Sequence, residues 1–189
     1  MHFAELQLDG DKKQWSGRTT RGAEVVIAPD GLMALDLVGG RAVYLSDLKP
    51  KRYDFTPFLD REWPWVRDGS VAGRDMVLAG STYTKGVGLH SESRLTYDLG
   101  GAYQRFEALV GIDDRTGREN GREGSARIGV LVDGKAQDVG GDKDLTPRGG
   151  PRAVKVNVAG ARELTLVVEF GRRQDVLDHV DWADARLVK

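Results

Sequence analysis

Carboxylate side chains gather in three short stretches of the chain, and clustered carboxylates can bind a cation or move protons. One stretch begins at Asp113 and Asp114 and enters a loop of glycines and charged residues, 115–124. Calcium takes about six to eight oxygen ligands, often from such a loop, but this spacing is not that of an EF-hand and the loop also carries arginines. Paired carboxylates can also hydrolyse glycosides at a suitable separation, which a sequence does not give. A calcium site, a solvated loop and a glycosidase pair therefore stay open. The oxygen donors are Asp113, Asp114, Glu119, Asn120 and Glu123; Asp138, Asp142 and Asp144; and Asp178, Asp181 and Asp184.

Two of the tryptophans stand where a binding platform is expected. Trp63 and Trp65 flank Pro64 in a segment rich in proline and aromatic residues. A sugar ring offers a face of C–H groups to an aromatic plane, although a tryptophan more often packs in a core than binds a ligand. Trp182 lies among alternating apolar residues, so we expect it to serve mainly in packing.

His90 follows a glycine pair and can play three roles. Gly86 and Gly88 lack the third glycine and the following helix of a dinucleotide fingerprint. We interpret them as a tight turn in which glycine adopts a positive φ. His90 can then be a hydrogen-bonded structural residue, a donor to a sugar, or a catalytic base. Its adjacency to Ser91 does not indicate a hydrolase triad, because triad members converge in space, and the chain has no Gly-x-Ser-x-Gly elbow.

The composition of the 189 residues excludes several partners and chemistries. The net charge is 28 − 29 = −1, so no uniform positive field attracts nucleic acid or an anionic membrane. No apolar run approaches the roughly 20 residues of a membrane span. The absence of cysteine excludes disulfides, thiolate zinc sites and cysteine nucleophiles. The first residues have neither the basic head nor the apolar centre of a signal peptide.

Alternating apolar and polar residues predict many short strands separated by glycine-rich turns. No long amphipathic helix interrupts them, which favours an all-β sandwich or barrel. Residues 1–42 look like a small β appendage, and residues 43–189 like the main domain. The predicted strands are 3–8, 24–28, 32–37, 95–99, 106–112, 126–132, 154–158 and 164–168.

Two segments depart from simple alternation. Ser46–Arg74 holds three prolines and five aromatic residues, so we expect an ordered, irregular segment that packs over the sandwich. Val176–Val188 fits a helix face or a strand. A loop through Asp178–Asp181 followed by a closing strand is the favoured interpretation.

Several motifs in order along residues 44–189 resemble the NPCBM family of carbohydrate-binding modules, also known as family 51. The run Tyr83–Ser93 matches its Tyr-x-Lys-Gly-x-Gly-x-His-x-x-Ser signature. Asp178–Ala185 matches its terminal Asp-His-x-Asp-Trp-Ala-x-Ala element. The further matching pieces are Tyr44–Leu48, Tyr97–Leu99, Phe106, Gly111–Asp114 and Asp133–Lys135.

The resemblance implies a jelly-roll β-sandwich of galactose-binding-like topology that binds galactose-type or related glycans without cleaving them. It also implies an accessory module of a glycoside hydrolase in a secreted or cell-surface bacterial protein, and a bound calcium in some members. The alternatives are an interaction or scaffold module without a sugar ligand and, third, a small glycoside hydrolase. The candidate carbohydrate-binding residues are His90, Trp63, Trp65, Asp113, Asp114, Asp178 and Trp182.

Overall fold

The structure is a computed structural model that describes residues 3–9, 14–19, 21–28, 41–141 and 143–189. The chain divides into two compact units, Met1–Gly39 and Gly40–Lys189, each of which is described by itself. We expected the division after residue 42. The described residues include a short 3-10 helix, η2 (Leu45–Asp47), and no helix among them is long and apolar enough to cross a membrane.

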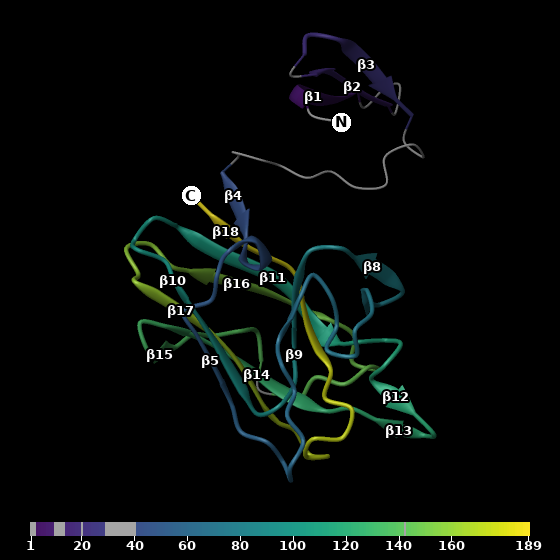
Figure 1. Cartoon of the computed structure of the whole chain (residues 1–189), viewed down its shortest axis with the longest axis vertical. Coiled ribbons are helices and arrows are strands. Elements are labelled where there is room, and N and C mark those ends of the chain that lie inside the picture. The colour runs from purple at the N-terminus through teal and green to yellow at the C-terminus, as the bar shows by residue number, and fades with distance from the viewer. Residues whose placement is uncertain (1–2, 10–13, 20, 29–40, 142) are drawn as a thin grey trace. The chain divides into compact units, whose positions relative to one another are not determined.

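The N-terminal unit contains a three-stranded antiparallel sheet with the order β1-β2-β3. Its strands are β1 (Phe3–Asp9), β2 (Gln14–Thr19) and β3 (Glu24–Ile27) (Figure 1). The sequence predicts β1 and β3 but not β2, because Trp15 is the only large apolar residue of β2 and no alternation shows there. The strand predicted at 32–37 lies outside the described residues.

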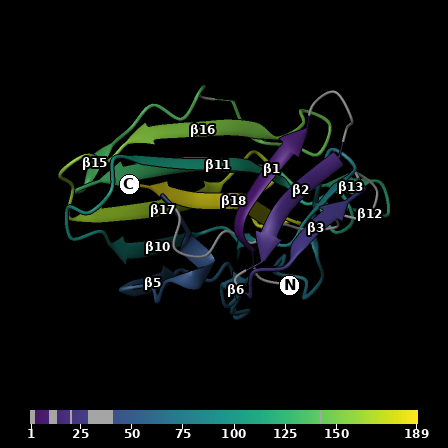
Figure 2. The ribbon, with the colours of Figure 1, turned by 90° about the horizontal axis from the view of Figure 1, so that it is seen from above.

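The second unit is a sandwich of two antiparallel sheets, as expected for an all-β fold (Figures 1 and 2). One sheet has the order β15-β14-β17-β10-β5. The other has the order β16-β11-β18-β9-β6, and β4 also pairs with β18. The five-stranded sheet contains β5 (Arg52–Phe55), β10 (Ser93–Asp98), β14 (Ala126–Val132), β15 (Lys135–Ala136) and β17 (Glu163–Phe170). The other contains β4 (Ala42–Tyr44), β6 (Val66–Arg67), β9 (Gly86–Leu89), β11 (Arg105–Ile112), β16 (Arg152–Asn157) and β18 (Val180–Val188).

The apolar positions that alternate in the sequence fill the space between the sheets. Tyr97 of β10 and Leu166 of β17 belong to the same buried cluster as Phe106 of β11 and Trp182 of β18. The rings of Phe106 and Trp182 lie 6.3 Å apart. The five predicted strands of this domain are thereby confirmed, and so is the packing role of Trp182, whose exposed fraction is 0%. Two small hairpins complete the unit, β7 (Met76–Leu78) with β8 (Ser81–Tyr83) and β12 (Arg118–Glu119) with β13 (Arg122–Glu123).

The glycine pair of the signature lies in strand β9 rather than in a tight turn, so that part of the interpretation is wrong, whereas the expected positive φ is present at Gly86. Gly86 has a φ of 147°, and a Cβ added there would lie 2.3 Å from the carbonyl oxygen of Trp182. A Cβ at Gly88 would lie 2.4 Å from the carbonyl oxygen of Gly69. Both glycines are needed because neighbouring backbone approaches β9 too closely for any side chain.

The proline-rich segment behaves as predicted. It contributes only the edge strands β5 and β6, which is where proline-rich sequence is tolerated. Its aromatic residues pack on the sandwich, for example Phe58 edge-on against Phe170 with ring centroids 5.8 Å apart. The closing strand β18 begins at Val180 rather than after Asp181, because Val180 pairs on one side with Ile112 and on the other with Leu89.

Candidate functional site

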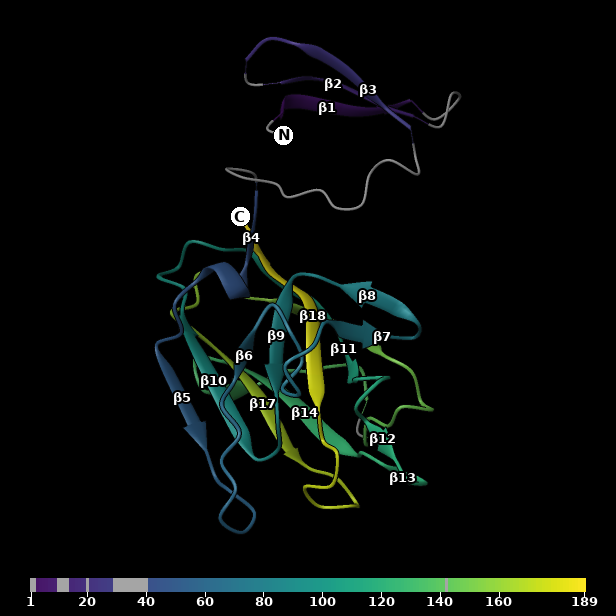
Figure 3. The ribbon, with the colours of Figure 1, turned by 45° about the vertical axis from the view of Figure 1, so that its right-hand side comes forward.

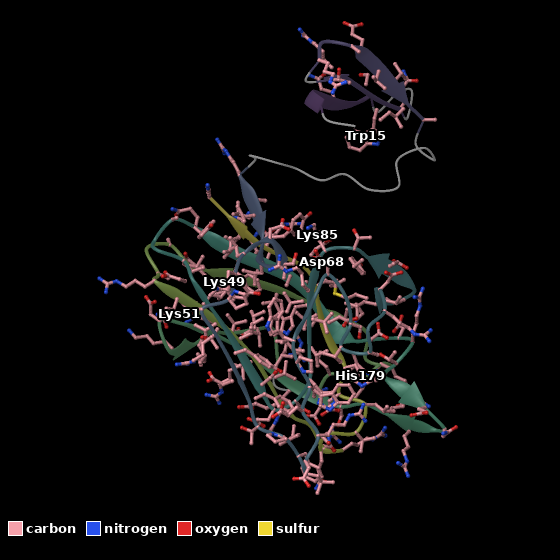
Figure 4. The ribbon with its side chains drawn as sticks, in the orientation of Figure 1. Trp15, Lys49, Lys51, Asp68, Lys85 and His179 are labelled. Carbon is pink, nitrogen blue, oxygen red and sulfur yellow. The ribbon has the colours of Figure 1, made fainter. Side chains whose placement is uncertain are left out.

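Three connecting segments meet at one end of the sandwich and bring Trp63, His90 and His179 together; we call these three residues the aromatic cluster. Trp63 comes from the β5–β6 connection, His90 from the β9–β10 turn, and His179 from the residues just before β18. Trp63 and His90 are stacked, with centroids 4.5 Å apart and planes 4° apart. His179 lies 5.4 Å from Trp63 and 5.5 Å from His90. Figure 3 shows these connections, and Figure 4 labels His179.

Both faces of the Trp63 ring are covered. The Arg61 guanidinium carbon lies 3.9 Å from the ring centroid of Trp63, and the His90 ring stacks on the same indole. Two planar groups this close to one ring centre would overlap on a single face, so they occupy opposite faces. The backbone at this point is held by Tyr53, whose hydroxyl donates a hydrogen bond of 2.5 Å to the Trp63 carbonyl oxygen.

The two histidines are buried and neutral at pH 7. Their exposed fractions are 1% for His90 and 7% for His179. Burial lowers the pKa of His90, and it lowers the pKa of His179 to about 4. His90 Nδ1 lies 2.8 Å from the carbonyl oxygen of Ser91, which can only accept, so Nδ1 carries the proton. His179 Nδ1 is buried without a hydrogen-bond partner among the described residues, which marks a place for a further polar group.

Asp178, just before β18, forms hydrogen bonds to the β9–β10 turn and to the residue that precedes β14. Its Oδ2 accepts a 2.7 Å hydrogen bond from Ser91 Oγ, and its Oδ1 accepts a 2.9 Å bond from the backbone nitrogen of Ser125. The carboxyl group is fully buried, and burial raises its pKa to about 7. Because Ser91 donates its proton to Asp178, it is not arranged as a nucleophile activated by His90.

Two further buried carboxyl groups, those of Asp113 and Asp181, lie next to each other. Asp113 accepts hydrogen bonds from the Val77 nitrogen (3.0 Å) and from the nitrogen and hydroxyl of Thr116 (2.8 and 2.7 Å). Burial raises the pKa of Asp113, but these bonds outweigh it and the pKa is lowered. Burial and the Asp113 charge raise the pKa of Asp181 well above its ordinary value. Both side chains are 0% exposed, so neither can reach a substrate in this conformation.

The structure brings together three of the seven residues predicted for the site: Trp63, His90 and Asp178. The other four lie elsewhere. Trp65 packs against the core with Arg67 at 6.0 Å, and Asp114 accepts a 2.8 Å hydrogen bond from the Gly80 nitrogen. Asp113 is fully buried, and Trp182 belongs to the core between the sheets. Sugar contact by any of the seven stays a prediction.

Arg61 and His179 are the members of this site that sequence reasoning did not select. Arg61 stands two residues before Trp63, and His179 directly follows Asp178. The aromatic neighbour of Arg61 was a usable signal, since guanidinium groups often stack on tryptophan. The terminal motif Asp178–Ala185 was a signal for His179, which lies within it.

The three carboxylate stretches do not fit a calcium site in the described residues. No group of three His, Asp or Glu side chains there comes together to hold a metal ion. Asp113 and Asp178 use both oxygens for protein donors, and Asp144 accepts from the Arg172 nitrogen at 2.8 Å. Asp142 lies outside the described residues. Calcium binding therefore stays a prediction without assigned ligands.

Residues 41–188 match the family model of the NPCBM/NEW2 domain. The chain is 30% identical over 118 residues to a protein of Renibacterium salmoninarum named as an endo-alpha-N-acetylgalactosaminidase. That match covers 61% of this chain, and the chain spans only 7% of the length of that relative.

Solved structures of Clostridium perfringens modules are also similar. The CBM51 of a GH95 protein in complex with methyl-galactose has a TM-score of 0.67 and 30% identity, covering 78% of this chain and 99% of that chain. The CBM51-2 and INT domains of ZmpB have a TM-score of 0.70 and 26% identity, covering 93% of this chain and 36% of that chain. The same domains in complex with GlcNAc have a TM-score of 0.70 and 25% identity, covering 100% of this chain and 40% of that chain.

Proposed function

Because the chain belongs to the NPCBM/NEW2 domain family, we propose that its second unit is a non-catalytic carbohydrate-binding module for galactose-type or related glycans. Similar structures carry methyl-galactose and GlcNAc. The observation that carries the proposal is the aromatic cluster, which places an indole ring and an unpartnered buried nitrogen at the loop end of the sandwich.

These groups suit the two kinds of surface on a sugar. The C–H face of a pyranose ring packs on an aromatic plane, which Trp63 supplies. Sugar hydroxyls need donors and acceptors. His179 Nδ1 offers a polar contact. We expect a Kd on the order of micromolar to millimolar.

The geometry supports binding rather than hydrolysis. Asp113, Asp178 and Asp181 are fully buried, so no sugar can lie between two of them as a glycosidase requires. The proposal places the module beside a glycoside hydrolase or another catalytic domain in a larger secreted protein. The Renibacterium relative, of which this chain matches a small part, supports that arrangement.

Calorimetric titration with methyl-galactose and GlcNAc tests the proposal. We expect saturable binding to at least one of them, with no release of reducing sugar from glycoside substrates. Trp63→Ala should weaken that binding by more than about tenfold, or 1.4 kcal/mol. Trp15→Ala, a tryptophan of the N-terminal unit, is the matched control and should bind as the wild type does (Figure 4).

Two results would contradict the proposal in different ways. If Trp63→Ala binds normally while remaining folded, the sugar site lies elsewhere on the module. If neither these sugars nor a glycan array shows binding, the carbohydrate function itself is wrong and the interaction-module alternative takes its place.

A further inference from the structure

The outer face of Trp63 is occupied in the free protein, and this limits how a sugar can reach it. One face of the indole is stacked on His90, which is only 1% exposed and therefore lies on the protein side. The Arg61 guanidinium covers the opposite face at 3.9 Å from the ring centroid. A ligand from solvent therefore meets Arg61 before it meets the ring.

We propose that Arg61 is a displaceable cover of the Trp63 ring, which a sugar must move aside to stack on the indole. The proposal rests on the proposed function, because it assumes that Trp63 is the sugar platform. It adds a regulatory feature of that site: the free state contains an intramolecular contact that competes with the ligand for one ring face.

The surroundings of Arg61 allow such a movement. Its side chain is exposed and takes part in no hydrogen bond or ion pair among the described residues. Movement of the guanidinium therefore breaks no polar pairing in that part of the chain. Trp63 itself cannot turn away as easily, because Tyr53 holds its carbonyl oxygen and His90 stacks on its inner face. The ring therefore stays in place while its cover moves.

The size of the competition follows from the contact that is lost. An exposed cation–π contact is weak enough that its removal should change Kd by about two- to fivefold. Arg61→Ala should therefore bind methyl-galactose or GlcNAc about two- to fivefold more tightly than the wild type. Arg67→Ala is the matched control, because Arg67 lies 6.0 Å from Trp65, away from the aromatic cluster. It should leave Kd unchanged.

A second measurement reports on the cover without any sugar. Removal of Arg61 uncovers an indole face, so acrylamide should quench the tryptophan fluorescence of Arg61→Ala more strongly than that of the wild type. The increase should disappear when Arg61→Ala is made in a Trp63→Phe background, which assigns it to Trp63 rather than to another tryptophan.

The outcomes separate the cover from the proposed function. If Trp63→Ala loses binding but Arg61→Ala binds as the wild type or more weakly, the site is right and the cover is wrong, and Arg61 is then a ligand contact or a bystander. If no variant binds either sugar, the proposed function fails. Unchanged acrylamide quenching in Arg61→Ala overturns the cover whether or not a sugar binds.

Discussion

The substitution Asp178→Asn tests whether burial of one carboxyl group sets part of the pH dependence of folding. Asp178 is fully buried with a pKa of about 7, against an ordinary value of 3.8. Between these two values the folded chain keeps a proton that the unfolded chain has lost. Stability contributed by this group is therefore fully present below pH 3.8 and is lost as the pH rises to about 7. The whole loss corresponds to about 4 kcal/mol.

Asparagine keeps the shape and both hydrogen bonds of Asp178 without the titration. Its Oδ1 can accept from the Ser125 nitrogen, and its Nδ2 can donate to Ser91 Oγ once that hydroxyl rotates. The free energy of unfolding of Asp178→Asn, relative to that of the wild type, should therefore increase by about 1.4 kcal/mol for each pH unit between pH 4 and 7. Between pH 5 and pH 8 the gain should total roughly 3 kcal/mol.

Urea unfolding of both proteins at a series of pH values measures this difference, provided that the m-values agree. Asp75→Asn is the control, because it removes an exposed carboxylate that is not among the charges that raise the pKa of Asp178. If the two variants show the same profile, net charge rather than the burial of Asp178 sets the effect. If the wild type and Asp178→Asn change in parallel from pH 5 to pH 8, the raised pKa is wrong.

Three further substitutions test buried positions of the second unit, each by chemical or thermal unfolding. Trp182→Ala should destabilise the module by about 3–5 kcal/mol, because the side chain is 0% exposed; a loss below 1 kcal/mol would refute its core role. Gly88→Ala should be destabilising by about 1–3 kcal/mol or more, since its Cβ would lie 2.4 Å from the Gly69 carbonyl oxygen; a native melting curve would contradict the close approach. Asp181→Asn should become more stable relative to the wild type as the pH rises above 3.8, because the raised pKa of the Asp181 carboxyl lowers the stability of the wild type at high pH. A stability difference that stays constant with pH would contradict the raised pKa.

The fold was largely predictable because its strands bury one face and expose the other. The pattern of β14, with buried Ala126 and Val130 and a following turn at Asp133-Gly134, is visible in the sequence alone. Strand β9 is not visible in the sequence, because both its faces are covered. Two of its four residues are glycines, which are required by the close approach of neighbouring backbone. Alternation of apolar and polar residues predicts strands with one buried face. It does not predict strands such as β9, in which contacts with distant parts of the chain determine which residues fit.

The site was predictable only in part for the same reason. His90 and Asp178 belong to motifs, and Trp63 was selected because it flanks Pro64 in a segment rich in proline and aromatic residues. Their meeting depends on three connections that the sandwich brings to one end, which no local spacing reveals. The stacking of Arg61 on Trp63 is local, yet its meaning depends on His90 occupying the other face.

The burial of the signature explains why the family is easier to identify than the sugar. Gly88, Asp113 and Trp182 carry the resemblance, and all three are buried because they shape strands and the core. Arg61 and Trp63, which reach solvent, stand in the proline-rich connection outside every motif. Loops tolerate change that a core does not, so a relative can keep the buried signature while the residues at the positions of Arg61 and Trp63 differ. Specificity in this module should therefore be sought first in the β5–β6 connection.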